Sequence, residues 1–225
     1  MTGLIAQRIN QIRQQIPSRV RLIAVTKQVS VEAIREAYEA GIRDFAENRI
    51  QEALPKQKQL EDLPDICWHF IGHLQANKAQ KALEHFEWIH SVDSLKLARR
   101  LDRLADSLPS KPKVCLQVKI LSDPKKYGFS VSELLAALSE LERCDRLNIR
   151  GLMTILPLGL SRSETLAAFQ ATRSLAEKIK QQNLSNLVFE ELSMGMSADY
   201  LLAIEAGATI IRLGRIIFGE RQGKI

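Results

Sequence analysis

Residues 21–46 read RLIAVTKQVSVEAIREAYEAGIRDFA, and this stretch holds the unit from which the rest of the fold can be inferred. Its first six residues are mostly apolar and β-branched, which favours a buried strand. Residues 31–40 are amphipathic, Ser30 can cap a helix there, and Gly41 follows the helical Glu-Ala pair as a C-cap. A second β-branched run begins at residue 42. The stretch therefore predicts a strand, a helix and a second strand.

The same alternation continues along the whole chain and gives eight pairings of strand and helix. We expect strands at about residues 21–26, 42–46, 67–71, 87–91, 113–119, 149–154, 187–192 and 209–213. We expect helices at about residues 2–16, 31–40, 48–60, 75–84, 94–107, 131–143, 161–182 and 197–206. Asp93, Ser130 and Ser161 stand where they can cap helices, and Gly207 is placed before the last strand as Gly41 is before the second.

Eight alternating units predict an α/β fold of one domain, residues 1–225, built as a (β/α)8 TIM barrel with an extra N-terminal helix. An open, doubly wound parallel sheet is the alternative that the pattern leaves open. Neither GxGxxG nor GxxxxGK[ST] follows any of the strands, which counts against the nucleotide-binding versions of the open sheet.

The amino-acid composition argues against several classes of protein. The chain has 225 residues, 45% of them apolar, with a net charge of +6 that is spread in pairs and not interleaved with aromatic residues. We therefore expect no nucleic-acid partner. Cys67, Cys115 and Cys144 lie far apart and form no CxxC pair, as in a reduced cytoplasmic protein. The sequence offers no leader and no apolar run that could span a bilayer, so we expect no membrane partner.

Lys27 lies at the end of the first strand and is the first candidate functional residue. By the two-residue period of a strand it shares a face with Ile23 and Val25, which points toward the interior. A buried lysine loses its proton readily, and the neutral amine can form a Schiff base with a carbonyl cofactor. The alternative is a solvated lysine just beyond the strand.

The last two strand ends carry residues suited to an anion. Barrel enzymes place their chemistry at the carboxyl ends of the strands, often with a phosphate held after strands seven and eight. Ser193-Met-Gly-Met-Ser197 follows strand seven, where Gly195 permits close approach of the backbone and Ser197 can cap the next helix. Arg212-Leu-Gly214-Arg215 ends strand eight. Each feature alone also fits an ordinary helix cap or a surface cation; together they predict a phosphate pocket facing an amine.

Several longer motifs carry a resemblance that covers nearly the whole chain. They are AVTK (24–27), AENRIQE (46–52), WHFIGHLQANK (68–78), KYGF (126–129), RGLMT (150–154), ELSMGMSADYLLAIEAGAT (191–209) and IRLGRIIFGER (211–221). In these segments the sequence resembles the YggS/PROSC family of pyridoxal-phosphate-binding homeostasis proteins. Ala46 departs from the glycine that this family more often has there.

The resemblance implies a fold-type III barrel similar to the N-terminal domain of alanine racemase, with pyridoxal 5'-phosphate (PLP) held covalently as a Schiff base on Lys27. It also implies roles for eight further residues. The residues implied to bind the phosphate are Ser193, Gly195, Ser197, Gly214 and Arg215. Arg212 would face the pyridine nitrogen, and Asn48 and Met153 would lie beside the ring. Lys119 and Lys78 are the alternative amines.

From this site we expect a cytoplasmic, monomeric PLP carrier that acts in vitamin B6, amino-acid and keto-acid homeostasis without robust turnover, with PLP-dependent apoenzymes as candidate recipients. An arginine against the ring nitrogen weakens the ring as an electron sink. Only seven residues follow Phe218, so we expect no second domain of the kind that completes a racemase site. The alternatives are a racemase of low activity that uses Tyr127 or a glutamate at 190 or 191 as its acid, and a nucleic-acid or protein-interaction module that senses the cofactor.

No metal site is expected. His69 and His73 have the i, i+4 spacing that binds a metal on a helix, but on a strand this spacing places their Cα atoms about 13 Å apart. His85 and His90 have no carboxylate or thiolate neighbours at a useful spacing.

Overall fold

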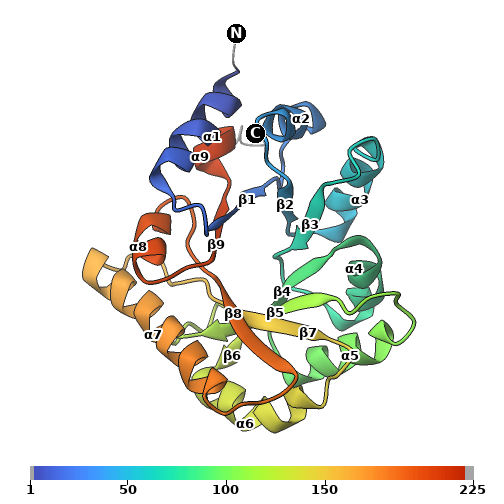
Figure 1. Cartoon of the computed structure of the whole chain (residues 1–225), viewed down its shortest axis with the longest axis vertical. Coiled ribbons are helices and arrows are strands. Elements are labelled where there is room, and N and C mark those ends of the chain that lie inside the picture. The colour runs from blue at the N-terminus through green and yellow to red at the C-terminus, as the bar shows by residue number, and fades with distance from the viewer. Residues whose placement is uncertain (1–2, 221–225) are drawn as a thin grey trace.

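Eight parallel strands close into a barrel around which the helices form an outer layer (Figure 1). The computed structural model describes residues 3–220. Neighbouring strands follow the order β4-β3-β2-β1-β9-β8-β7-β5, and pairing of β4 with β5 completes the ring. The strands are β1 (Arg21–Val25), β2 (Asp44–Glu47), β3 (Cys67–Phe70), β4 (Trp88–Val92), β5 (Lys113–Lys119), β7 (Asn148–Met153), β8 (Leu187–Ser193) and β9 (Ile210–Leu213). This arrangement confirms the predicted TIM barrel and excludes the open sheet.

The helices between the strands carry the apolar stripes that cover the barrel. They are α1 (Leu4–Gln15), α2 (Val31–Glu39), α3 (Ile50–Gln59), α4 (Ala79–His85), α5 (Leu95–Ala105), α6 (Val131–Glu142), α7 (Arg162–Lys180), α8 (Tyr200–Glu205) and α9 (Arg215–Phe218), with a 3-10 turn, η1, at Ala76–Lys78. The extra N-terminal helix is confirmed as α1, which packs beside α2 and α9 (Figure 1). The start expected at residue 2 lies outside the described residues, as does Arg221 of the last motif.

Serine side chains cap the N-termini of four helices in the described part of the chain. Ser30 caps α2, and Ser130 and Ser161 each form a complete capping box with the glutamate three residues later. The predicted cap at Asp93 is wrong, because Ser94 caps α5 by accepting a hydrogen bond from the Leu97 amide.

Two further elements differ from the sequence prediction. The strand β6 (Phe129–Ser130) and the helix α9 were not predicted. Each is four residues or fewer, too short to produce a periodic pattern. Gly41 and Gly207, by contrast, follow their helices with φ angles of 89° and 102°, as expected of glycine C-caps.

Alternation along the strands separates an outer core from a barrel interior. Leu22 and Ala24 belong to the large apolar core shared with the helices, whereas Ile23 and Val25 belong to a small separate cluster with Ala46 and Ile210. A second small cluster contains Trp88, Cys115 and Met153. Buried polar residues, namely His69, His90, Ser193 and Arg212, occupy the same side of their strands. The barrel interior is therefore only partly apolar.

Cys67, Cys115 and Cys144 are free thiols that are wholly or partly buried, which agrees with their predicted role in packing. Among residues 3–220, no helix combines the length and the apolar character that crossing a membrane requires.

The capping box of α7 gives a direct test of how this boundary is held. Ser161→Ala removes the hydroxyl that accepts the Glu164 amide hydrogen bond, and should lower the free energy of unfolding by about 1 kcal/mol in urea titrations. Ser174→Ala is the matched control, because Ser174 is exposed in the middle of the same helix. An equal effect of both changes would contradict the capping role.

Candidate functional site

A cavity of about 420 Å³ opens at the carboxyl ends of the strands. Its lining comes from the segments that follow β1, β2, β3, β7, β8 and β9. The lining residues are Val25, Lys27, Asn48, Ile71, Gly72, Ile155, Leu156, Pro157, Leu158, Met196, Ser197, Ala198, Asp199, Arg212, Gly214 and Arg215. Six of the nine residues predicted for the site lie here: Lys27, Asn48, Ser197, Arg212, Gly214 and Arg215.

Lys27 lies in the turn that follows β1 and is half-buried at the cavity. Val25, two residues earlier on the same face, also lines the cavity. The next residue, Gln28, has a φ angle of 61°, which is uncommon for a residue other than glycine. Such a conformation persists where the surroundings hold it, so the contacts around this turn decide where the lysine amine lies.

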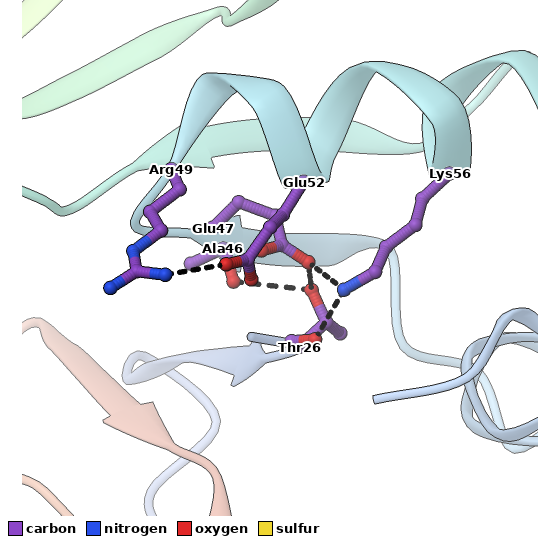
Figure 2. Close-up of polar contacts among 6 residues, drawn as sticks. All are labelled: Thr26, Ala46, Glu47, Arg49, Glu52 and Lys56. Atoms are coloured by element: carbon purple, nitrogen blue, oxygen red, sulfur yellow. Dashed lines mark hydrogen bonds and ion pairs between the residues drawn. The ribbon is translucent and has the colours of Figure 1, made fainter. Parts of the chain in front are cut away.

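The residue before Lys27 is held by a buried ion pair (Figure 2). The Thr26 amide donates to the Ala46 carbonyl at 2.9 Å, and the Thr26 hydroxyl donates to Glu47 Oε1 at 2.7 Å. Lys56 Nζ, reaching from α3, is 2.7 Å from both Glu47 Oε1 and the Thr26 carbonyl oxygen. The Glu47 side chain is fully buried. Because the amide, hydroxyl and carbonyl of Thr26 are all bonded, the backbone entering the Lys27 turn is fixed.

Sequence reasoning missed Glu47 and Lys56. Glu47 appears in the AENRIQE motif, but nothing in the pattern indicates that a lysine nine residues later turns back to meet it. The second carboxylate oxygen of Glu47, Oε2, is buried with no hydrogen-bond partner among the described residues. Arg49 and Glu52, at the start of the same helix, form a more exposed pair at 3.0 Å (Figure 2).

Arg212 forms part of the cavity wall although its side chain is almost fully buried. Its Nη1 donates to the Ser193 carbonyl at 2.6 Å and to Ser193 Oγ at 2.8 Å, and its Nη2 donates to the Thr154 carbonyl at 3.0 Å. Burial lowers the pKa of the guanidinium to about 10, so it remains a cation at neutral pH. A buried cation therefore faces the same cavity as the Lys27 amine.

Three predicted residues do not line the cavity. Ser193 is fully buried between Arg212 and His90. Met153 packs in the cluster with Trp88 and Cys115. Gly195 has a φ angle of 93°, and a Cβ there would lie 2.6 Å from Ala203 Cβ, so glycine allows α8 to pack closely. Ser193 therefore contacts the lining through Arg212, and the Met153 cluster contacts it through Ile155.

The segment after β8 differs in detail from the sequence prediction. Ser197 lines the cavity, but the expected helix cap is wrong, because α8 begins at Tyr200 with Asp199 as its N-cap residue. Asp199 Oδ1 accepts from the Met196 amide at 2.6 Å. Burial raises the pKa of this carboxyl. Gly214 is the N-cap of α9 and Arg215 is its first residue.

The candidate acids of the racemase alternative lie elsewhere. Tyr127 stacks on His73 with ring centroids 3.6 Å apart, and His73 is in turn 3.0 Å from Asp93. Glu190 is exposed and pairs with Arg150, and Glu191 accepts from the Thr209 hydroxyl. None of the three lines the cavity.

His69 does not approach His73 but meets Asp44 and Cys67 at the start of the barrel, where one ligand atom from each lies within 4.8 Å of the others. No sequence pattern indicates this grouping, because its members come from two strands. His69 Nε2 is already bonded to Asp44 at 2.9 Å. Burial raises the pKa of the Cys67 thiol to about 12; the Asp44 and Glu87 carboxylates raise it as well, and Arg21 and Lys113 lower it. The thiol is therefore protonated at neutral pH, whereas the thiolate is the form that binds a metal ion.

The buried pair predicts a strong effect of Lys56→Met. Removing the amine leaves the Glu47 carboxylate buried without its partner, which should lower the free energy of unfolding by about 3–5 kcal/mol. Lys58→Met, on the exposed side of the same helix, is the control and should change it little. Adding Glu47→Gln to Lys56→Met should recover part of the loss. Equal denaturation midpoints for the two lysine variants would contradict this account.

Comparisons of the sequence and the fold with known proteins identify the family of this chain. The family described as alanine racemase, N-terminal domain, matches residues 2–222. A relative from Synechocystis sp. named pyridoxal phosphate homeostasis protein is 53% identical over 212 residues, which cover 94% of this chain and 96% of the relative.

Solved structures give the same relationship. PipY of Synechococcus elongatus PCC7942 with PLP bound has a TM-score of 0.91 and 53% identity, and the match covers 96% of this chain and all of that one. Alanine racemase of Clostridium difficile 630 has a TM-score of 0.77 at 16% identity, which shows likeness of fold only, and this chain covers 57% of it. The chain therefore belongs to the alanine racemase N-terminal domain family and, within it, to the YggS/PROSC family of pyridoxal phosphate homeostasis proteins.

Proposed function

We propose that this chain binds PLP in the cavity at the carboxyl end of the barrel, through a covalent bond to Lys27, and acts in intracellular PLP and amino-acid homeostasis. The observation that carries the proposal is that the Lys27 amine and the buried Arg212 cation line one cavity. A volume of about 420 Å³ is within the range of small-molecule sites. The binding of PLP by PipY, which is 53% identical, supports the same ligand here.

The lining residues fit the chemical groups of this cofactor. Lys27 offers an amine for the aldehyde, which PLP supplies as its reactive group. Three of the five N–H groups of Arg212 are bonded to Ser193 and Thr154, which leaves two for the ring side. Ser197, Gly214 and Arg215 offer a hydroxyl, backbone groups and a cation for the phosphate. Asn48 completes the lining beside Lys27.

Ser193, Gly195 and Met153 enter the proposal in a supporting role. Ser193 holds Arg212, Gly195 sets the path of the segment that precedes Ser197, and Met153 belongs to the cluster against which the lining residue Ile155 packs. Their effect on PLP binding would be through the residues that they position.

We propose further that the chain carries PLP without robust turnover. The curated relatives are named as homeostasis proteins and not as enzymes. A permanent cation against the ring nitrogen would keep that nitrogen unprotonated and weaken the ring as an electron sink. PLP-dependent apoenzymes are the proposed recipients of the cofactor, and the proposed carrier is a cytoplasmic monomer.

The covalent attachment is tested by titrating PLP into purified protein and recording the absorption spectrum. Lys27→Ala should abolish the band of the covalent adduct and leave the circular dichroism spectrum unchanged. Lys78→Ala and Lys119→Ala, which change the alternative amines, should retain it. Borohydride reduction followed by peptide mapping should place the label on Lys27. A label on another lysine would refute this assignment.

Turnover is tested by incubating the PLP-loaded protein with each common amino acid. Optical rotation, keto-acid release, amine release and exchange of the α-proton for deuterium should all stay near the rate of free PLP. Rapid turnover in any of these assays would favour the racemase alternative and contradict the carrier proposal.

A further inference from the structure

A continuous row of hydrogen bonds crosses the barrel interior from Arg212 to Asp44. Arg212 Nη1 lies 2.8 Å from Ser193 Oγ, which lies 2.8 Å from His90 Nδ1. His90 Nε2 lies 2.9 Å from His69 Nδ1, and His69 Nε2 lies 2.9 Å from Asp44 Oδ1. The five residues belong to β9, β8, β4, β3 and β2, so the row joins opposite sides of the ring of strands (Figure 1).

The partners at the two ends determine the direction of every bond in the row. A guanidinium can only donate, so Ser193 Oγ accepts from Arg212. At the other end a carboxylate can only accept, so with both imidazoles neutral every bond points toward Asp44, and the Ser193 hydroxyl donates to an unprotonated His90 Nδ1. His90 then carries its proton on Nε2 and donates to His69 Nδ1. His69 likewise carries its proton on Nε2 and donates to the Asp44 carboxylate. The same tautomer is therefore required in both imidazoles.

Burial keeps both imidazoles in the neutral form that this row needs. His69 and His90 are fully buried, and desolvation is the largest cause that lowers the pKa of each. Arg21 lowers the pKa of both rings, and Arg212 lowers that of His90. Asp44 acts in the opposite direction on His69, as the acceptor of its hydrogen bond should.

The Trp88 ring stacks on His69 at a centroid distance of 5.8 Å and lies 5.7 Å from His90. Packing of this kind limits rotation of the two imidazoles. The tautomers and the ring orientations are thus constrained together.

The aligned bonds have an electrostatic consequence for the buried cation. Each donor in the row points away from Arg212, so the negative end of each dipole faces the guanidinium. Arg212 has no carboxylate among its hydrogen-bond partners in the described chain. The row connects it instead to the distant Asp44 carboxylate, and this arrangement favours one orientation of the Ser193 hydroxyl.

The row also connects two separate cavities. Arg212 lines the cofactor cavity, whereas Asp44 lines a second cavity of about 500 Å³ at the amino ends of β1 and β2, together with Arg21 and Arg43. His69 and His90 line neither cavity. Any effect of His69, His90 or Asp44 on a ligand of the cofactor cavity must therefore pass through other residues.

We propose that His90, His69 and Asp44 are positioning residues for Arg212. They hold the Ser193 hydroxyl as an acceptor and so fix the guanidinium in the orientation in which its remaining N–H groups are available to the cofactor. This inference rests on the proposed PLP-binding function, since Arg212 is taken to contact the PLP ring there.

The direction of the row is tested in the protein without PLP by long-range ¹H–¹⁵N correlation of the imidazole rings. The chain has four histidines, so His69→Gln and His90→Leu spectra assign the signals. His69 and His90 should both show a protonated Nε2 and an unprotonated Nδ1. A protonated Nδ1 in either ring at neutral pH would overturn the proposal. This readout does not involve PLP, so it also distinguishes the inference from failure of the proposed function.

The effect on the site is tested by PLP titration of His90→Leu, which breaks the row without touching the cofactor cavity. The dissociation constant should rise between about twofold and thirtyfold, the range of indirect coupling, and the absorption maximum of bound PLP should shift. Ile210→Val, which reduces a nearby interior side chain outside the row, should change neither. Binding and spectrum equal to wild type in His90→Leu would refute the proposal.

Asp44 supplies a second test at a partly exposed position, where folding tolerates change better than in the barrel interior. Asp44→Asn keeps an oxygen acceptor for His69 Nε2 and should preserve both the tautomers and PLP binding. Asp44→Leu removes the acceptor, so part of His69 should change tautomer and PLP binding should weaken. Identical tautomers and identical affinities in the two variants would refute the proposal. Wild-type protein that binds no PLP would instead refute the proposed function.

Discussion

The pairing of β1 with β9 is the constraint on which the site depends. The register places Ile23 opposite Arg212 and Ala24 opposite Leu213, so it closes the barrel between residues almost 190 positions apart. Only this closure brings the turn after the first strand to the end of the last one. The Lys27 amine and the Arg212 cation then line one cavity, whereas an open sheet with the same strands would leave its first and last strands unpaired.

Buried charged groups are the second condition for the site, and hydrogen bonds offset most of the cost of burying them; Glu47 Oε2 is left without a partner among the described residues. Arg212 is buried among carbonyl groups and a hydroxyl, and Glu47 is buried against Lys56 and Thr26. Unpaired, either charge would be strongly destabilising. Both sets of contacts lie directly behind a residue that faces the cavity. The contacts that make the buried charges tolerable are thus the same ones that hold the cavity wall in place.

Local patterns were enough to predict the barrel and most strand ends, since alternation and caps are visible along the chain. Lys27, Ser197, Arg212, Gly214 and Arg215 could be placed together because parallel strands end at the same edge of a barrel, whereas Asn48 was predicted from the family resemblance alone. The burial of Ser193 and the row through His90 and His69 could not be predicted. These depend on which side chains meet across the interior, and thus on register shifts such as those beside Cys115 and Gly151, which leave no periodic signal.

The distribution of titratable groups in the cavity favours holding a cofactor over transforming a substrate. Among the described lining residues these groups are Lys27, Asp199, Arg212 and Arg215. Two are guanidinium groups, which cannot exchange a proton at neutral pH. The one carboxylate, Asp199, accepts the Met196 amide hydrogen bond through Oδ1, which ties it to the backbone of the cavity wall. The side of the cavity formed by residues 155–158 is apolar. Asp199 is therefore the only lining residue other than Lys27, among those described, that could exchange a proton near neutral pH, and the remaining groups bind and orient.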